Sequence, residues 1–271
     1  MFNAQELLGS LMSAGTSQSG QGRMRHALGS DGLGGSNGLL GKLMGNLGGG
    51  GSGSGDLLGG LAGMAGTMMG DAKRSVGSGN PLAVGGLGAL AGSLLGGGGG
   101  SLKGAMGGGA LALLGSLALD ALRNANTGDA GGSTVTADEL PIGVREPRDE
   151  TETRQLESKA TLIIQAMANA AKADGSIDGS EIQKIAGKLK EQGADSEARE
   201  YVLKLLESPM DTDKLLGSVG DQQTAAEVYS ASILAIEVDT AAERQYLGDL
   251  AQRLGLAPEV VNRIHLLLGV S

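Results

Sequence analysis

The sequence predicts an all-α protein: an orthogonal bundle of about seven helices, preceded by a region rich in glycine and leucine. Three observations predict this class. Of the 51 glycines, 41 lie in residues 1–133 and 10 lie in residues 134–271. Beyond about residue 148 the apolar residues recur with the 3.6-residue period of a helix, and no window alternates as a strand does. With no cysteine, no tryptophan and one phenylalanine, the core must be built from aliphatic side chains.

Charge divides the chain at the same place as glycine. Residues 1–133 carry 7 Lys and Arg against 6 Asp and Glu, whereas residues 134–271 carry 14 against 24. An acidic domain repels phosphate backbones, so no nucleic acid is expected as a ligand, and cations or basic protein surfaces are favoured. We expect four segments: a glycine-rich low-complexity region (1–74), an apolar membrane-associating segment (75–123), a linker (124–148) and the helical domain (149–271).

The N-terminal half repeats a short motif, Leu-Leu-Gly-x-Leu, at Leu7–Leu11, Leu39–Leu43, Leu57–Leu61 and Leu113–Leu117. Each glycine costs about 1 kcal/mol relative to alanine in a helix, so the glycine runs between these pieces disfavour long helices in water. The stretch from about residue 16 to residue 55 is predicted to be a flexible, low-complexity linker.

Residues 75–123 have features that predict contact with a membrane. Glycines recur at four-residue spacing from Gly88 to Gly108, which on a helix forms a bare ridge that lets two helices approach closely in lipid. Leu82–Leu102 is about as long as the ~20 residues that cross a bilayer. Gly104–Leu119 is shorter and is expected to be half of a helical hairpin or an interfacial piece. The alternative is a disordered, sticky tail with no membrane contact.

Each helix of the C-terminal domain is predicted from an apolar stripe and from the residues that flank it. Pro209 ends the third helix and Asp211 caps the fourth. Gly255 ends the sixth helix in a left-handed conformation, and Pro258 suits the first position of the seventh. The predicted helices are about 149–173, 179–192, 196–207, 212–218, 222–236, 240–254 and 258–268.

An acidic turn joins the first two of these helices. Asp174, Ser176 and Asp178 match positions 1, 3 and 5 of a calcium-binding EF loop, but position 12, where that loop needs a glutamate, is Ile185. The turn is therefore not an EF-hand. Asp178 and Glu181 have the spacing of a capping box, which explains these two acids but not Asp174.

A related pattern occurs at the junction between the fifth and sixth helices, where Asp239 can be interpreted as a plain N-cap. If the two junctions face each other, their carboxylates converge, and clustered hard oxygens favour Ca²⁺ or Mg²⁺. Helix capping alone is the alternative. The candidate metal ligands are Asp174, Asp178, Glu181, Glu237, Asp239 and Glu243.

The first junction, Ala170-Ala-Lys-Ala-Asp-Gly-Ser-Ile-Asp-Gly-Ser-Glu181, resembles the first motif of the TerB-like (tellurite-resistance protein B) helical domains. With the second motif, Glu237-Val-Asp-Thr-Ala-Ala-Glu243, and the glycine- and leucine-rich N-terminal half, the arrangement is similar to YebE-type bacterial inner-membrane proteins of unknown function. The resemblance covers about residues 150–270. It implies an all-α bundle, metal-binding acidic clusters and an association with membranes and stress response. The second motif departs from the first because Val238 stands where a glycine would follow the leading acid.

No catalytic centre is predicted, because the sequence has no G-x-S-x-G, H-E-x-x-H or P-loop, and His26 and His265 lie in different halves. We expect not an enzyme but a protein of the bacterial inner membrane, with its helical domain in the cytoplasm. It is expected to bind a divalent cation, a protein partner or both, in a stress, tellurite or envelope response. The alternative function is a self-associating glycine-zipper scaffold with a structural helical adaptor and no metal site. The alternative location is the cytoplasm.

Overall fold

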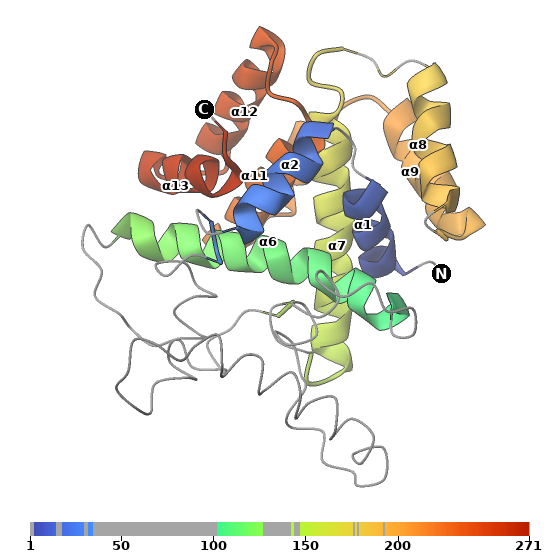
Figure 1. Ribbon diagram of the computed structural model, residues 1–271, viewed down its shortest axis with the longest axis horizontal. Helices are drawn as coiled ribbons and strands as arrows, with labels where there is room; N and C mark the ends of the chain where they lie inside the picture. Colours follow the sequence, from blue (N-terminus) through green and yellow to red (C-terminus); the bar gives the residue numbers. More distant parts are fainter. Residues whose placement is uncertain are drawn as a thin grey trace, which may run out of the picture.

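Figure 1 shows the computed structural model of the chain, which describes residues 3–14, 18–29, 32–34, 102–126, 142–143, 147–175, 177, 179–191 and 193–270. These residues form helices and no strand, so the all-α prediction is confirmed for them. The helices are α1 (Ala4–Ala14), α2 (Gln18–Leu28), α6 (Leu102–Asn126), α7 (Glu150–Ala170), α8 (Gly179–Glu191), α9 (Ser196–Glu207), α10 (Thr212–Gly217), α11 (Gln222–Ala235), α12 (Ala241–Arg253) and α13 (Pro258–Leu268).

The bounds of helices α7 to α13 agree with the prediction to within three residues. Side-chain caps explain much of the agreement, because α7 and α9 to α12 each begin where an acid or hydroxyl accepts a hydrogen bond from a backbone N–H three residues on. α13 begins without a side-chain cap, with Pro258 in its first position. Asp195 caps α9 in this way, Asp211 caps α10 and Asp221 caps α11. Gly255 has a φ of 65°, the left-handed conformation expected after α12.

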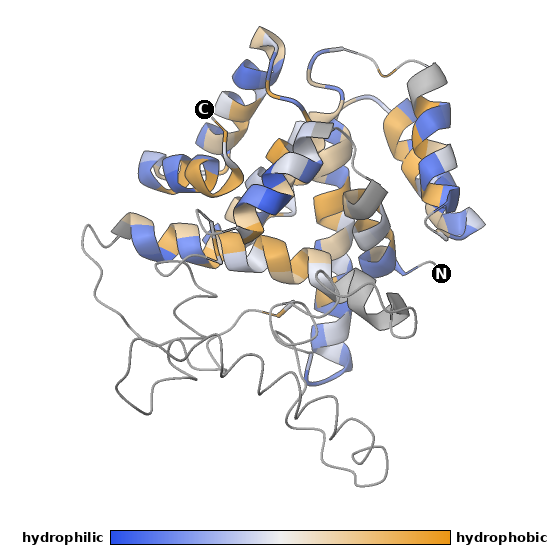
Figure 2. Ribbon diagram, in the orientation of Figure 1, coloured by the Kyte–Doolittle hydropathy of each residue, from blue (hydrophilic) through white to orange (hydrophobic). Residues whose placement is uncertain are grey.

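Helices α7 and α11 form the centre of the fold and pack against each other (Figure 1). Helix α11 is buried from Thr224 to Ala235, and α7 buries residues on most of its length after Leu156. Apolar residues lie mainly on the faces that the helices turn towards one another, and polar residues lie mainly on the outer faces (Figure 2). The core is aliphatic as predicted, and Tyr229 is its largest fully buried side chain.

The core extends beyond the predicted helical domain at 149–271. Helices α1, α2 and α6 pack on α7, α11 and α13, and Leu7, Leu8, Leu114 and Leu117 are at most 1% exposed. α6 is a 25-residue helix despite its glycines, which differs from the hairpin half or interfacial piece expected at 104–119. Burying one leucine side chain yields about 1.5–3 kcal/mol, which outweighs the ~1 kcal/mol cost of a glycine.

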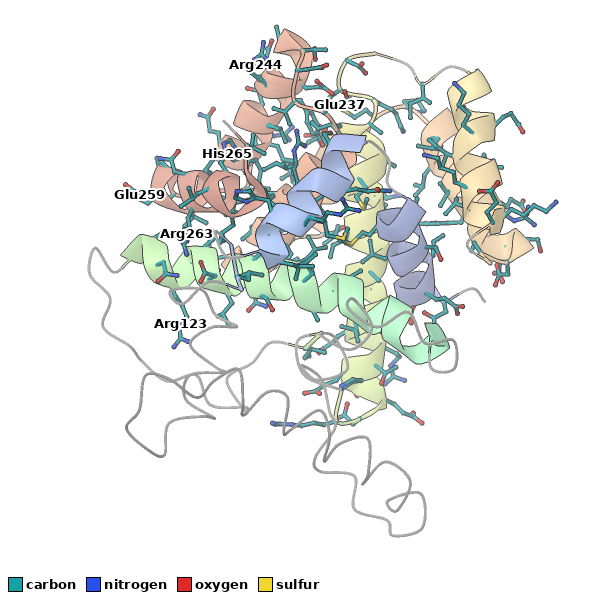
Figure 3. The ribbon with its side chains drawn as sticks, viewed as in Figure 1. Arg123, Glu237, Arg244, Glu259, Arg263 and His265 are labelled. Carbon is teal, nitrogen blue, oxygen red and sulfur yellow. The ribbon has the colours of Figure 1, made fainter. Side chains whose placement is uncertain are left out.

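A buried ion pair joins α6 to the last helix. Asp120, which is 3% exposed, accepts a 2.8 Å hydrogen bond from Nε of Arg263 on α13. The same carboxylate oxygen lies 2.7 Å from the second guanidinium nitrogen. Figure 3 shows Arg263 reaching from α13 towards α6. A buried, charge-assisted pair of this kind holds one helix against the other.

The described helices include none that combines the length and the apolar character needed to cross a bilayer. The predicted span Leu82–Leu102 lies outside the described residues except for its last position, and so do residues 35–101 as a whole. Most of the predicted linker, residues 127–141 and 144–146, also lies outside them. Membrane contact by residues 75–101 therefore stays a prediction.

Candidate functional site

The first acidic junction is described only in part. α7 ends at Ala170, and Asp174 follows in an exposed turn. Asp178 lies outside the described residues, and Glu181 is in the first turn of α8 with a side chain that is outside the description. Asp174 lies beyond the end of α7, whose C-cap is Ala171. Its role as a metal ligand stays a prediction.

At the second junction, hydrogen bonding corrects the predicted cap. Thr240, not Asp239, is the N-cap of α12, because its hydroxyl accepts the backbone N–H of Glu243 at 3.1 Å. The Glu243 carboxylate in turn accepts hydrogen bonds from the backbone N–H of Thr240 at 3.0 Å and from that of Asp239 at 3.1 Å. This is a complete capping box, and its N-cap comes one residue after the plain N-cap that was predicted.

The capping box also sets the charge of Glu243. Burial would raise the pKa of Glu243, but the hydrogen bonds from Thr240 and Asp239 outweigh burial and hold that pKa below its ordinary value. The carboxylate is therefore ionised and occupied by its own helix end. Glu237, labelled in Figure 3, and Asp239 are exposed. Among the residues that the structure describes, no three or more His, Asp or Glu side chains are placed to hold a metal ion together.

Arg23 of α2, which lies near the N-terminus of the sequence, contacts the second junction. Its guanidinium, 9% exposed, donates to the carbonyl oxygens of Ile233, Ile236 and Glu237, at the C-terminus of α11. Burial lowers the pKa of Arg23, while the charges of Glu237 and Glu243 raise it. A cation is favoured at this position because the last carbonyls of a helix carry partial negative charge. Sequence reasoning missed Arg23, because the contact spans more than 200 residues of chain.

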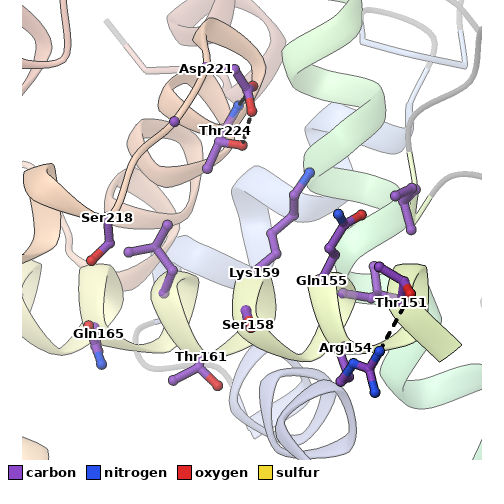
Figure 4. Close-up of a pocket in the computed structure, with 14 residues that line it drawn as sticks. Thr151, Arg154, Gln155, Ser158, Lys159, Thr161, Gln165, Ser218, Asp221 and Thr224 are labelled. Carbon is purple, nitrogen blue, oxygen red and sulfur yellow. Dashed lines mark hydrogen bonds between the residues drawn. The ribbon is translucent and has the colours of Figure 1, made fainter.

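A half-open groove of about 860 Å³ runs along α7, opposite the segment that leads into α11 (Figure 4). Apolar side chains of α7 form part of its wall, and hydroxyl and amide side chains form most of the remainder. We refer to it as the α7 groove. It is lined by Ile142, Thr151, Arg154, Gln155, Leu156, Ser158, Lys159, Thr161, Leu162, Gln165, Ser218, Gly220, Asp221 and Thr224.

Beside the α7 groove, Lys159 reaches a buried carboxylate on α11. Its ammonium lies 3.2 Å from Oε1 of Glu227, in hydrogen-bond geometry, and 3.0 Å from Oε2. Gln223 donates a further 3.0 Å bond to Oε1, whereas Oε2 accepts no hydrogen bond from the described residues. Glu227 is 1% exposed, and burial raises its pKa, against the lowering by Lys159. The sequence analysis did not single out Glu227 or Lys159, because nothing in the helical pattern distinguishes them from surface charges.

Both histidines lie in helices, and a ring nitrogen of each is within hydrogen-bond distance of a neighbouring oxygen. Nε2 of His265 and the Tyr229 hydroxyl are 2.8 Å apart, and the two rings are stacked. Burial, with the charge of Arg23, lowers the pKa of His265, and burial raises the pKa of Tyr229 to about 12. Both groups are therefore uncharged at neutral pH. His26 contacts the carbonyl oxygen of Leu267 through Nδ1, at 3.2 Å.

Comparison with known proteins places the chain in a family. Residues 77–268 match the family model described as "Protein of unknown function (DUF533)". The chain is also similar to the "Uncharacterized protein in ampR 5'region" of Yersinia enterocolitica, with 26% identity over 115 residues, which are 42% of this chain and 83% of that protein. No solved structure matches the chain. The match to the family model begins before α6 and ends at the last residue of α13, so it includes α6 with the seven helices that follow. The chain therefore belongs to the DUF533 family of proteins of unknown function.

Proposed function

We propose that this chain is a non-enzymatic, membrane-associated binding protein whose helical bundle recognises a basic segment of a protein partner through the α7 groove. The volume of about 860 Å³ is within the range of pockets that bind ligands. Residues 134–271 carry 14 basic against 24 acidic side chains, and this negative charge attracts basic partners at long range. Within the groove itself, Asp221 is the acid that such a partner would meet, beside Arg154 and Lys159.

The Lys159–Glu227 pair is the observation that carries this proposal. A buried carboxylate that must be held by an ammonium and an amide costs stability through desolvation, and an apolar side chain at position 227 would avoid that cost. Acids whose pKa is raised by burial gather at functional sites. A basic group in the α7 groove would meet Asp221 in the groove wall and would compete with Lys159 for the buried Glu227 carboxylate.

Site-specific photo-crosslinking tests the proposal. A photoreactive side chain at Gln155 or Ser158, in the α7 groove, is expected to trap a partner in cells, whereas the exposed Asn262 on α13 serves as the matched control. We expect the adduct to weaken in the Glu227→Gln variant and with rising salt, because salt screens exposed charges. Equal adduct yields at all three positions would contradict recognition through the groove.

The membrane association is proposed for residues 75–101. The glycines at four-residue spacing, and the resemblance to TerB-like, YebE-type inner-membrane proteins, support a location at the inner membrane with the bundle in the cytoplasm. Washing membranes with alkaline carbonate is expected to leave the chain in the pellet. Its release into the supernatant would refute an inserted segment and leave the alternative of a cytoplasmic adaptor.

Divalent-cation binding is a second candidate function, at the first acidic junction. Asp174 supports it, because this exposed acid follows the C-cap of α7. A ligand that binds only the folded chain raises its melting temperature, so millimolar Ca²⁺ or Mg²⁺ is expected to do so. Alanine at both Asp174 and Asp178 should abolish the rise, and alanine at the exposed Asp249 should not. A melting temperature unchanged by both ions would rule out the site.

A further inference from the structure

Helix α2 packs on α11 and α13, but it buries few apolar side chains there (Figure 1). Ala27 is buried, and Met24 and Leu28 are partly buried. Helix α1, by contrast, buries three leucines and a methionine. Apolar burial therefore contributes less to the attachment of α2 than to that of α1. A segment with few buried apolar contacts opens locally at a low free energy.

Arg23 attaches α2 to the C-terminus of α11. Its guanidinium donates to the carbonyl oxygens of Ile233, Ile236 and Glu237. The turn that follows is strained, because Val238 has a φ of 60°, in the left-handed region that a β-branched side chain disfavours. Such strain persists only where surrounding contacts enforce it, and Arg23 supplies one of these contacts. Release of α2 would therefore let the turn between α11 and α12 relax.

Both histidines of the chain lie near α2. His26, on α2 itself, lies against the C-cap of α13, where a Cβ atom at Gly269 would come within 3.0 Å of its ring. Nδ1 of His26 is 3.2 Å from the carbonyl oxygen of Leu267, and an N–H at this nitrogen can donate to that oxygen whether the ring is neutral or charged. The His26 contact therefore survives acidification.

The contacts of His265 on α13 favour the neutral ring. Its Nε2 is 2.8 Å from the Tyr229 hydroxyl, and a neutral ring can accept the hydroxyl hydrogen there. A charged ring carries a hydrogen on both nitrogens, so the hydroxyl of Tyr229, which is 1% exposed, would need another acceptor inside the bundle. The guanidinium of Arg23 would also repel the new charge. Both effects of protonation oppose the docked arrangement.

We propose that α2 is a pH-sensitive strap, which protonation of His265 releases from α11 and α13. Release withdraws Arg23 from the end of α11 and uncovers the second acidic junction. Helix α1 stays in the core through its leucines. The strap does not depend on the α7 groove, because no residue of α2 lines that groove.

Linkage between proton binding and docking sets the direction of the response. While α2 is docked, burial and the charge of Arg23 hold the pKa of His265 below its ordinary value of 6.5. Release removes the charge of Arg23, so the released state binds the proton more tightly. Docking is therefore strongest above pH 6.5 and weakens as pH falls below it. Because one proton is taken up, the ratio of released to docked α2 rises by up to about tenfold per pH unit.

The other charged groups near this contact do not produce the same response. On α6, which also packs on α13, Asp120 is held by Arg263. Burial lowers the pKa of Arg23, while the charges of Glu237 and Glu243 raise it. Burial raises the pKa of Glu243, but the hydrogen bonds of its capping box hold that pKa below its ordinary value, so Glu243 remains ionised where histidine titrates. The response in that range is therefore assigned to the ring on α13.

Hydrogen exchange of the full chain, read by mass spectrometry at a series of pH values, tests the strap. Each rate is divided by the intrinsic amide rate at the same pH, which leaves the protection of each helix. We expect protection of α2 to fall below pH 6.5 by up to about tenfold per pH unit, while protection of α1 stays constant. An equal fall in α1 would overturn the proposal, because the whole bundle would then be responding.

Two matched variants assign the response to one ring. His265→Gln should abolish the pH dependence of α2 protection, because an amide takes up no proton in this range. His26→Gln removes the other histidine and should leave the dependence in place. A dependence that persists in His265→Gln, or that disappears only in His26→Gln, contradicts release by His265.

An NMR titration of the two imidazole rings tests the same step with His265 in place. In the natural chain His265 is expected to titrate below pH 6.5, and in the Arg23→Gln variant its midpoint should move up towards that value. Protection of α2 in this variant should be low at every pH, because the attachment to α11 is lost. A His265 midpoint at or above 6.5 in the natural chain, or one unmoved by Arg23→Gln, would overturn the proposal.

Discussion

The cap of α12 depends on Thr240. Its hydroxyl and the Glu243 carboxylate satisfy backbone N–H groups that have no partner inside the helix. We predict that Thr240→Ala lowers the free energy of unfolding by about 1–2 kcal/mol, as removal of an N-cap does elsewhere. Thr240→Ser, which keeps the hydroxyl, should cost much less. Urea denaturation of the two variants measures the difference, and equal losses would mean that the methyl group, not the cap, matters.

Glu227 is predicted to make stability depend on pH. Its folded pKa is raised by burial, so between its unfolded value, near 4.5, and its folded value the native state binds more protons than the unfolded state. Stability from this group is therefore highest at the acid end of that window and falls as pH rises through the folded pKa. Urea midpoints of the natural chain minus those of Glu227→Gln should decrease over the window. A difference that is constant with pH would contradict a raised pKa.

Several individual roles could be read from the sequence, and others could not. Asp211 acts locally, so its position just before an apolar stripe was sufficient to predict a helix start. Asp195 and Asp221 cap their helices in the same way, although the sequence analysis did not name them. Arg23 and Glu227 contact residues that are far away in the sequence, so the residues next to them do not predict these contacts. Thr240, rather than Asp239, is the N-cap of α12. The sequence could not decide between these adjacent residues, because both residue types cap helices.

At the scale of elements, α6 is the helix whose role differs most from the expectation. From the sequence, its apolar face was expected to contact a membrane. In the structure, Leu111, Leu114 and Leu117 are buried in the protein core. Glycine content and the absence of charge do not distinguish a helix that packs in lipid from one that packs on protein, because both environments are apolar. Only the helices opposite α6 decide between them.

The packing of α6 predicts a test with two leucine variants. Leu114 is 0% exposed, so Leu114→Ala is expected to cost about 2–5 kcal/mol in the free energy of unfolding. Leu266 on α13 is 57% exposed, and Leu266→Ala should change stability by less than ~0.5 kcal/mol. Urea denaturation of the full chain compares them. Small and equal effects would mean that α6 does not belong to the folded core.

For the whole molecule, one shared core predicts shared cooperativity. Helices α1 and α6 bury their leucines with α7 and α11, so none of them can open without exposing the others. We expect the slowest amides in α6 to exchange with solvent at the free energy of global unfolding, as those of α11 do. Hydrogen exchange read by mass spectrometry measures both helices in one experiment. A much lower value for α6 would show that the C-terminal helices fold without it.

The sequence by itself determined the all-α class, the bounds of helices α7 to α13 and the aliphatic nature of the core. These properties follow from local periodicity, caps and composition, which each segment carries whatever its neighbours are. Only the tertiary structure decided that α1, α2 and α6 share that core, that Arg23 caps α11 and that Glu227 lies buried beside Lys159. Each of these depends on side chains far apart in the chain being brought together, and the free energy of burying them exceeds the local preferences of their own segments.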